Sequence, residues 1–320
     1  MYREPVRVRP LGPRDVDAVC ERVVARAAAA ARRCALLEGT LDREALRRAV
    51  ASAAPAWVAR SRGRVVGHLA TALVDGSRGR AWVPPDGASF DGSAVLGALV
   101  CAAAPAWRDA GANGFSAWVY DEPAEVEAWM MCGAAPSARR GVRVLSPPPD
   151  PRTGAELALR RADFDDLEVA LTLDRWGDPP GAPEPEEGER RREVTDLLED
   201  PDVDYLVAEL DGLAIAQAVV MPLAPRRGSR ANAVHLSAVA VHPDWRGRGL
   251  GGHLVESVLE RARVAGYAVA EVNWRTRDPR VEIFWRARGF TPTHALVEGA
   301  LPPTKEVPPR SRRRGSGPRG

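Results

Sequence analysis

The sequence predicts an α/β protein of two similar halves, each with a mixed sheet flanked by helices. Apolar strands and amphipathic helices recur in the same order on both sides of residues 147–155. That segment contains four prolines, which is typical of a stiff linker between domains. With 320 residues, the chain is long enough for two ordinary domains, each with a core of its own. We expect domains at 1–146 and 156–304, followed by a disordered basic tail at 305–320.

The first half is predicted to alternate between strands and helices. Strands are expected at 6–10, 57–60, 65–73, 81–83 and 115–120, and helices from 13, at 42–53, at 93–109 and at 123–131. The second and third strands flank the turn sequence Ser61-Arg62-Gly63-Arg64, which predicts a hairpin.

The second half begins again in the same order. Strands are expected at 156–161, 205–210, 213–221, 234–241, 269–274 and 292–300, and helices from 163 to about 176, at 187–198, from 250 and at 278–288. Asp211-Gly212 predicts a two-residue hairpin turn, and Gly266 is expected to end the helix that begins at 250. This restart predicts a tandem repeat of one fold.

The sequence VHLSAVAVHPDWRGRGLGG, residues 234–252, is the most informative stretch. It begins as an alternating strand, which Pro243 ends because proline cannot extend a β-ladder. A glycine-rich turn with Arg246 and Arg248 follows, and then an amphipathic helix begins. Glycines let backbone N–H groups approach an anion, and the helix dipole adds about half a positive charge. The stretch therefore predicts an anion-binding site, although a plain connector would also fit the glycines.

Arg246, Gly249 and Gly251 match the pattern Gln/Arg-x-x-Gly-x-Gly/Ala in a strand–turn–helix context. This resembles the pyrophosphate-binding motif of the GNAT superfamily of acyl-CoA-dependent N-acetyltransferases, and the resemblance covers about 156–300. It implies a mostly antiparallel central sheet in each half and acetyl-CoA as co-substrate, with no metal. The residues that it implies for binding acetyl-CoA are Val239, Ala240, Val241, Arg246, Gly247, Arg248, Gly249, Leu250, Gly251 and Gly252.

The first half follows the same order of elements without this turn. At the corresponding place, residues 84–92 read PPDGASFDG, with two carboxylates and no arginine. Such a segment would repel a pyrophosphate. We therefore expect the N-terminal half to be a degenerate GNAT-like domain with a structural role.

The resemblance also places candidate catalytic residues. An acceptor amine must lose a proton before it attacks a thioester. GNAT enzymes often carry the base on the strand before the turn, where His235 stands, although His235 could equally be a strand residue with a satisfied side chain. The other polar candidates on neighbouring strands are Glu271, Asn273 and Tyr205.

The helix at 278–288 departs from the family pattern at two positions. GNAT enzymes commonly have a tyrosine four residues before a Gly-Phe pair, and here Trp285 precedes Gly289-Phe290. An indole cannot protonate a thiolate, so Trp285 would pack against pantetheine, donate a hydrogen bond to sulfur, or belong to the core. Asp278, where an asparagine is common, is followed by Pro279 and is interpreted as a helix N-cap.

The predicted function is acetyl transfer to a primary amine, on a small molecule or a peptide, by direct attack in a ternary complex. All four cysteines lie in the first half without Cys-x-x-Cys pairing, so neither an acyl-cysteine route nor a metal site is expected. The alternative is a non-catalytic module that binds acetyl-CoA as a sensor or regulator.

Composition and charge limit the partners. Segment 305–320 has six basic residues and one acidic residue, and the whole chain carries a net charge of +2. Residues 1–304 therefore carry a net charge of −3, so we do not expect nucleic acid as a partner. Acidic residues across 178–200 favour a cationic acceptor or, alternatively, form a solvated helix face. The start MYREPVRVRP lacks an apolar secretion signal, and no run of about 18 apolar residues occurs, so we expect a cytoplasmic protein without membrane contact. A homodimer remains open.

Overall fold

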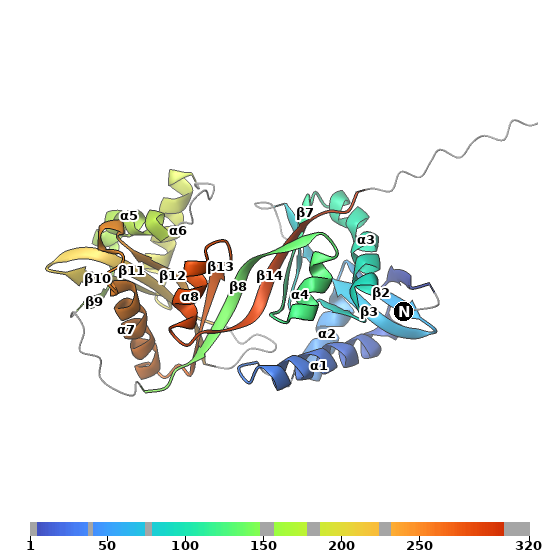
Figure 1. The fold of residues 1–320 in the computed structure, drawn as a ribbon. Helices are drawn as coiled ribbons and strands as arrows, with labels where there is room; N and C mark the ends of the chain where they lie inside the picture. The colour runs from blue at the N-terminus through green and yellow to red at the C-terminus, as the bar shows by residue number, and fades with distance from the viewer. Residues whose placement is uncertain are drawn as a thin grey trace, which may run out of the picture.

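The computed structural model describes residues 5–37, 41–73, 79–147, 157–177, 186–223 and 232–303. Most of the predicted linker and the whole basic tail lie outside these residues. The chain forms two halves that lie side by side, with strands running between them (Figure 1). Within the described ranges, no helix is both long and apolar enough to cross a membrane.

The N-terminal half contains the predicted elements and a further long strand. Its strands are β1 (Arg7–Pro10), β2 (Ala56–Ser61), β3 (Arg64–Ala70), β4 (Ala72–Leu73), β5 (Arg80–Val83), β6 (Ala88–Phe90), β7 (Gly114–Tyr120) and β8 (Ala134–Val144). Its helices are α1 (Val16–Arg33), α2 (Arg43–Ser52), α3 (Ser93–Asp109) and α4 (Pro123–Met130), with a 3-10 turn η1 (Pro13–Asp15) before α1. Strand β8 was not predicted, because its small residues and Pro136 give weak β-propensity.

The C-terminal half repeats this order. Its strands are β9 (Ala158–Arg161), β10 (Asp204–Leu210), β11 (Leu213–Pro222), β12 (Ala233–Val241), β13 (Val269–Arg275) and β14 (Thr291–Ala300). Its helices are α5 (Leu167–Gly177), α6 (Glu187–Glu199), α7 (Leu250–Val264) and α8 (Pro279–Arg286), with 3-10 turns η2 (Phe164–Asp166) and η3 (Pro243–Trp245). The predicted turn at Asp211-Gly212 is confirmed, with φ of 53° and 78°, as is the helix end at Gly266, with φ of 94°.

Each half starts with the same local arrangement of an arginine and an aspartate. In the first half the Asp15 carboxylate accepts hydrogen bonds from Arg9, at 2.7 and 2.8 Å, and from the Gly12 N–H at 3.0 Å. In the second half Asp166 binds Arg160 at 2.6 and 2.7 Å and the Asp163 N–H at 3.0 Å. The hydrogen bonds from Arg160 are the main cause of a lowered pKa of Asp166. The equal six-residue spacing supports a repeated unit.

A ten-stranded sheet joins the two halves. Its order is β4-β5-β7-β14-β8-β13-β12-β11-β10-β9. The last strand of each half therefore pairs with strands of the other: β14 lies between β7 and β8, and β8 lies between β14 and β13. In Figure 1 the green β8 and the red-orange β14 cross the centre of the molecule. The halves are thus consecutive in sequence but share one sheet, which the sequence did not predict.

Helices cover both faces of this arrangement. In the C-terminal half, α5 packs with β10 and β11 in one apolar cluster, whereas α7 packs on the other side in a second cluster that contains Trp274, Trp285 and Phe290. In the N-terminal half, β1, β2, β3 and β6 form a separate four-stranded sheet, and α3 packs against β2 and β3. The cores therefore lie between helices and sheet in both halves.

Each half contains two parallel strands that separate part way along their length. Strands β12 and β13 are paired only up to Leu236 and Val272, although both continue beyond this point. In the N-terminal half β5 pairs with β7 up to Val83, after which the chain moves away and β6 pairs with β3 instead. Backbone groups along such a gap need another partner.

In the N-terminal half arginines of α1 contact the residues beside this gap and line a cavity of about 710 Å³ between α1, the turn at Asp91-Gly92 and α4. Arg26 donates a hydrogen bond to the carbonyl of Pro85 at 2.7 Å, pairs with Glu125 of α4, and stacks over the Tyr120 ring at 4.4 Å. Arg22 binds Asp91 at 2.6 Å and Ser89 Oγ at 3.3 Å.

These contacts refine the prediction for residues 84–92. Residues 88–90 form strand β6, so only Asp91-Gly92 separates strand from helix. The carboxylate of Asp91 is bound by Arg22, and it therefore neutralises a residue of the chain itself.

Replacing Gly141 by alanine should destabilise the shared sheet. A Cβ at this position of β8 would lie 2.6 Å from Cη2 of Trp274 and 3.3 Å from Cβ of Phe290. Overpacking of this kind costs about 1–3 kcal/mol, so we expect a lower urea midpoint for Gly141→Ala. The control is Gly188→Ala in α6, where a Cβ meets nothing within 4 Å. Equal midpoints for the two variants would contradict the proposed packing.

Replacing Arg26 by methionine should cost much more stability than the same change at Arg33. The side chains of Arg26 and Glu125 are 15% and 12% exposed, whereas Arg33, which pairs with Glu122, is 65% exposed. Removing one partner of a buried pair costs about 3–5 kcal/mol, and an exposed pair contributes about 1 kcal/mol or less. Urea unfolding of both variants measures the difference. Similar losses would show that Arg26 does not fill a buried position.

Candidate active site

A crevice of about 570 Å³ lies at the end of β12, between the glycine-rich turn and α8. We call it the cofactor crevice. It is lined by Val239, Ala240, Val241, Trp245, Arg246, Gly247, Gly249, Leu250, Gly251, Gly252, Arg280, Val281, Phe284, Trp285 and Arg288. Nine of the ten residues named from sequence as acetyl-CoA contacts are therefore brought together in one cavity, the exception being Arg248.

The turn has the geometry that an anion site requires. The 3-10 turn η3 ends β12, and the His242 ring accepts a hydrogen bond from the Asp244 N–H at 3.1 Å. Gly247 and Gly249 then adopt φ of 77° and 80°, a left-handed conformation that other residues rarely take. Helix α7 begins at Leu250, so its positively polarised N-terminus lies at the crevice, where the Gly252 N–H donates to the Gly249 carbonyl at 2.9 Å.

Four arginines surround this turn, and sequence analysis found only two of them. Arg246 reaches back to the Val241 carbonyl at 2.9 Å, whereas Arg248 stacks over the Trp245 ring at 4.8 Å and does not line the crevice. Arg280 and Arg288 enter from α8 and the residues after it. The sequence has five arginines between 275 and 288 and no local signal that distinguishes these two.

Arg288 reaches the crevice because of a glycine on α7. Its guanidinium stacks on the Phe284 ring at 3.5 Å and donates to the Phe284 carbonyl at 2.8 Å. A Cβ at position 252 would overlap this guanidinium, so Gly252 provides the space that Arg288 occupies. The second glycine of the Gly251-Gly252 pair therefore serves side-chain packing rather than backbone conformation.

Trp285 belongs to both the core and the crevice. It is 6% exposed and makes edge-to-face contacts with Phe284 and Phe290, at 5.1 and 5.2 Å between ring centroids. The interpretation of Trp285 as a core residue is thus compatible with a position in the wall of the crevice. Asp278 caps α8 by accepting a hydrogen bond from the Arg280 N–H at 2.9 Å, which confirms the capping interpretation.

His235 lies outside the cofactor crevice. Its partner in register on β13 is Glu271, and its Nδ1 lies 3.9 Å from Oε1 of that carboxylate. Glu271 in turn forms an ion pair of 3.0 Å with Arg140 of β8. The two candidate catalytic residues, His235 and Trp285, are therefore not walls of one cavity.

The other polar candidates lie in different environments. The Asn273 side chain is within 3.3 Å of Arg140 Nε, so it belongs to the same polar group as Glu271. Tyr205 is buried, its hydroxyl is hydrogen-bonded to Gln217 at 2.9 Å, and burial raises its pKa. Tyr205 is thus a core residue.

The two faces of β12 explain how His235 and the crevice are related. Val234 and Leu236 face the cluster around α7, so Ala233 and His235 face the opposite side. A bulge leaves Ser237 outside the pairing between β11 and β12, after which Val239 and Val241 pack towards the α7 side. His235 therefore lies just below the point where β12 and β13 separate, on the face away from α7.

Helix α6, which carries most of the described part of the acidic segment, is held against α5 by ion pairs. Charged residues of α6 are paired with α5, through Arg190–Asp174, Arg191–Glu168 and Arg175–Glu187. These pairs favour the interpretation as a helix face, while Asp178 and Glu184 lie outside the described residues. Within the described ranges, no group of three or more His, Cys, Asp or Glu side chains is arranged to hold a metal ion.

Comparisons with known proteins agree with this geometry. A family model described as the acetyltransferase (GNAT) family matches residues 169–290. A solved GCN5-related N-acetyltransferase from Sphaerobacter thermophilus is 17% identical and covers 95% of this chain and 98% of its own, with a TM-score of 0.61. A tandem GNAT protein from the clavulanic acid biosynthesis pathway is 19% identical and covers 94% and 100%, with a TM-score of 0.50. At these identities the two structures show a shared fold.

Curated relatives match part of the chain. An amino-acid acetyltransferase of Azotobacter vinelandii is 33% identical over 135 residues, which are 42% of this chain and 28% of that protein. One of Pseudomonas paraeruginosa is 31% identical over the same shares. The chain thus spans little more than a quarter of the length of these relatives. Residues 169–290 thus match the acetyltransferase (GNAT) family, and the shared fold and the turn at the end of β12 agree with that match.

Proposed function

We propose that the C-terminal half transfers an acetyl group from acetyl-CoA to a primary amine by direct attack in a ternary complex. The observation that carries this proposal is the separation of β12 from β13, with an anion-binding turn at its end and His235 below it on the opposite face. The name of the curated relatives, amino-acid acetyltransferase, favours a small amino acid over a protein as acceptor.

The residues of the crevice fit acetyl-CoA. First-turn N–H groups of α7 and Arg246 would bind the pyrophosphate, and Arg280 and Arg288 would bind further phosphate oxygens. Along 239–241 the edge of β12 has no ladder to β13, so its backbone groups would hydrogen-bond the pantetheine amides. Trp285 and Phe284 form an apolar wall for the same arm.

His235 would act as the general base. It would take a proton from the ammonium form of the acceptor, directly or through one water, so that nitrogen can attack the thioester carbonyl carbon. The carbon–sulfur bond then breaks and coenzyme A leaves as a thiolate, while the remaining excess proton on the nitrogen passes through water to the sulfur. The carboxylate of Glu271, 3.9 Å from Nδ1, would stabilise the imidazolium formed in the first step.

A second candidate function is a sensor that binds acetyl-CoA without turnover. The specific observation in its favour is Trp285, which occupies the place where a tyrosine could protonate the leaving thiolate. The two functions differ in turnover and agree in cofactor binding.

Acetyl-CoA should bind with a stoichiometry of one per chain. The cavity at the corresponding place of the N-terminal half has Asp91, Glu122 and Glu125 among its lining residues, whereas the crevice at 239–252 is lined by residues suited to phosphate. Arg246→Glu places a negative charge at the pyrophosphate site and should weaken binding by at least about 100-fold, since about 1.4 kcal/mol corresponds to each factor of ten. The control is Arg192→Glu on the exposed face of α6, which should bind normally. Calorimetric titration measures both values.

The outcomes of this titration are distinct. Two sites per chain would contradict the degenerate N-terminal half. An absence of binding would contradict both candidate functions.

Replacing His235 by alanine should abolish turnover and spare cofactor binding. Loss of a general base lowers kcat by about 10²–10⁴-fold, while acetyl-CoA affinity should stay within about twofold because His235 lies outside the crevice. Release of coenzyme A thiol in the presence of amino acids measures turnover. His253→Ala in α7 is the matched control and should retain activity. Unchanged turnover of His235→Ala would exclude it as the base, and a wild-type protein that binds acetyl-CoA but acetylates no amine would favour the sensor.

A further inference from the structure

We propose that the acceptor binds in a second cavity, built by both halves, and that it is a small α-amino acid with an apolar or aromatic side chain. This inference rests on the proposed acetyl transfer and adds the place and the class of the acceptor. The cavity has a volume of about 420 Å³ and lies over the centre of the shared sheet. We call it the junction pocket.

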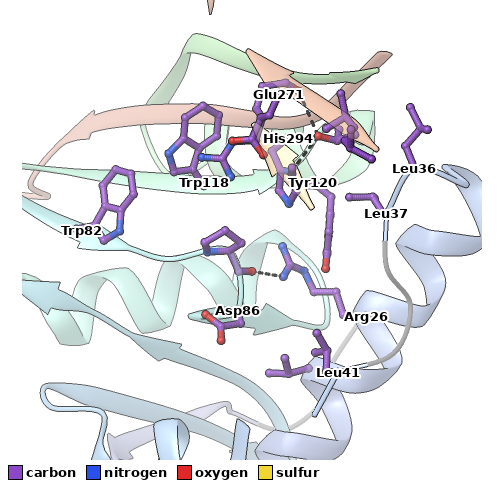
Figure 2. A pocket seen from close by; sticks show the side chains of 17 residues that line it. Arg26, Leu36, Leu37, Leu41, Trp82, Asp86, Trp118, Tyr120, Glu271 and His294 are labelled. Carbon is purple, nitrogen blue, oxygen red and sulfur yellow. Dashed lines mark hydrogen bonds and ion pairs between the residues drawn. The ribbon is translucent and has the colours of Figure 1, made fainter. Parts of the chain in front are cut away.

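The junction pocket has walls from both halves (Figure 2). Strands β7 and β8 of the N-terminal half and β12, β13 and β14 of the C-terminal half contribute residues to one side. Helix α1, the residues that follow it and the segment after β5 form the other side, through Arg26, Leu37 and Asp86 among others. Neither half could form this cavity without the strands β8 and β14 that join them.

One end of the junction pocket lies next to the proposed reaction centre. Glu271, which lines the pocket, pairs in register with His235, and the next pair, Leu236 with Val272, is the last before the strands separate. The pocket lies on the His235 face of the sheet, whereas the helices α7 and α8 of the cofactor crevice lie on the other face. An amine in the pocket and a thioester from the crevice would therefore meet at the gap from opposite sides.

The charges at this end match those of a zwitterion. Arg140 and Glu271 form an ion pair of 3.0 Å with side chains only 11% and 8% exposed. The guanidinium of Arg140 also lies over the Trp118 ring at 4.4 Å, which fixes its plane. A carboxylate can accept about four hydrogen bonds and a guanidinium can donate five. An α-amino acid would place its ammonium at Glu271, beside His235, and its carboxylate at Arg140.

The rest of the pocket is suited to an apolar side chain. Trp82, Tyr120, Leu37 and Leu41 line it, and Figure 2 shows them around the same space. The Tyr120 ring is held between Arg26, at 4.4 Å, and His294, at 5.1 Å between centroids.

His294 adds no positive charge to this space near neutral pH. Burial, together with Arg140 and Arg26, lowers its pKa to about 3. Asp86 is a second carboxylate of the pocket, on the side of Arg26 in Figure 2, away from the gap between β12 and β13.

This arrangement gives the degenerate half a role. Beside its own gap Arg22 binds Asp91 and Arg26 binds the Pro85 carbonyl, and the surface of this half beside the junction forms a wall of the pocket. Arg26 has two roles: it lines the junction pocket, and it binds the Pro85 carbonyl beside the gap of its own half. The N-terminal half would therefore decide which acceptor is used, although the chemistry takes place in the other half.

The first test is direct binding to the full-length protein in the presence of coenzyme A, which occupies the crevice without allowing transfer. The probes are L-phenylalanine, L-leucine, phenethylamine, which lacks the carboxylate, and 3-phenylpropanoate, which lacks the amine. We expect calorimetric titration to show dissociation constants for both amino acids at least about tenfold lower than those of the two analogues. Phenethylamine that binds as tightly as L-phenylalanine would overturn the assignment of Arg140.

The second test fills the pocket from the N-terminal half. Leu37→Trp should weaken L-phenylalanine binding and raise its KM by at least about tenfold, with the dissociation constant of acetyl-CoA unchanged. Leu213→Trp, at a side chain 57% exposed on β11 and outside the pocket, is the matched control and should behave as wild type. A second variant, Trp82→Ala, removes an aromatic side chain from the pocket wall. It keeps the test decisive if Leu37→Trp does not fold. The loss of affinity in Trp82→Ala should be larger for L-phenylalanine than for L-alanine.

These measurements separate this inference from the proposed function. Wild-type affinity for amino acids in both Leu37→Trp and Trp82→Ala would overturn the pocket assignment. Binding of acetyl-CoA without binding of any probe would overturn it too and leave acetyl transfer standing. Binding of amino acids without binding of acetyl-CoA would instead contradict the proposed function.

Discussion

The pairing of β8 with β14 is the interaction on which the rest of the structure depends. Each strand is the last of its half, and each lies next to the other half's β7 or β13. This exchange satisfies the backbone groups of β7 and β13, which would otherwise be sheet edges. It also sets the distance between α1 and the C-terminal strands, and thus forms the junction pocket.

The two halves use the same backbone geometry in different ways. In both, parallel strands separate, and the groups along the gap need partners. In the N-terminal half Arg26 binds the Pro85 carbonyl, and Arg22 binds the side-chain hydroxyl of Ser89 beside it. The C-terminal half has a turn with positive-φ glycines and arginines at the corresponding place, so its geometry suits a ligand with negative charge. The N-terminal half has a cavity of about 710 Å³ at this place, but its lining includes Asp91, Glu122 and Glu125, which disfavour a pyrophosphate.

The arrangement of polar groups around β12 relates the two cavities. Successive side chains of a strand point to opposite faces, so His235 and Val239 would share a face in a regular strand. The bulge at Ser237 reverses this order, and Val239 and Val241 in the crevice wall therefore lie on the face opposite to His235. The chain of contacts from His235 to Glu271 and Arg140 extends across three strands, of which β8 belongs to the N-terminal half. Electrostatics at the proposed reaction centre therefore depend on both halves.

The sequence by itself determined those features that depend on neighbours along the chain. The strand–turn–helix at 234–252, the hairpin turn at Asp211-Gly212 and the cap at Asp278 were predicted because proline, glycine and aspartate act on the backbone within a few residues. Only the tertiary structure decided the exchange of β8 and β14, the entry of Arg288 beside Gly252, and the grouping of Arg140, Glu271 and His235. These contacts join residues far apart in the sequence, and neither strand propensity nor spacing specifies which partners meet, because pairing is set by packing and backbone hydrogen bonds over the whole sheet.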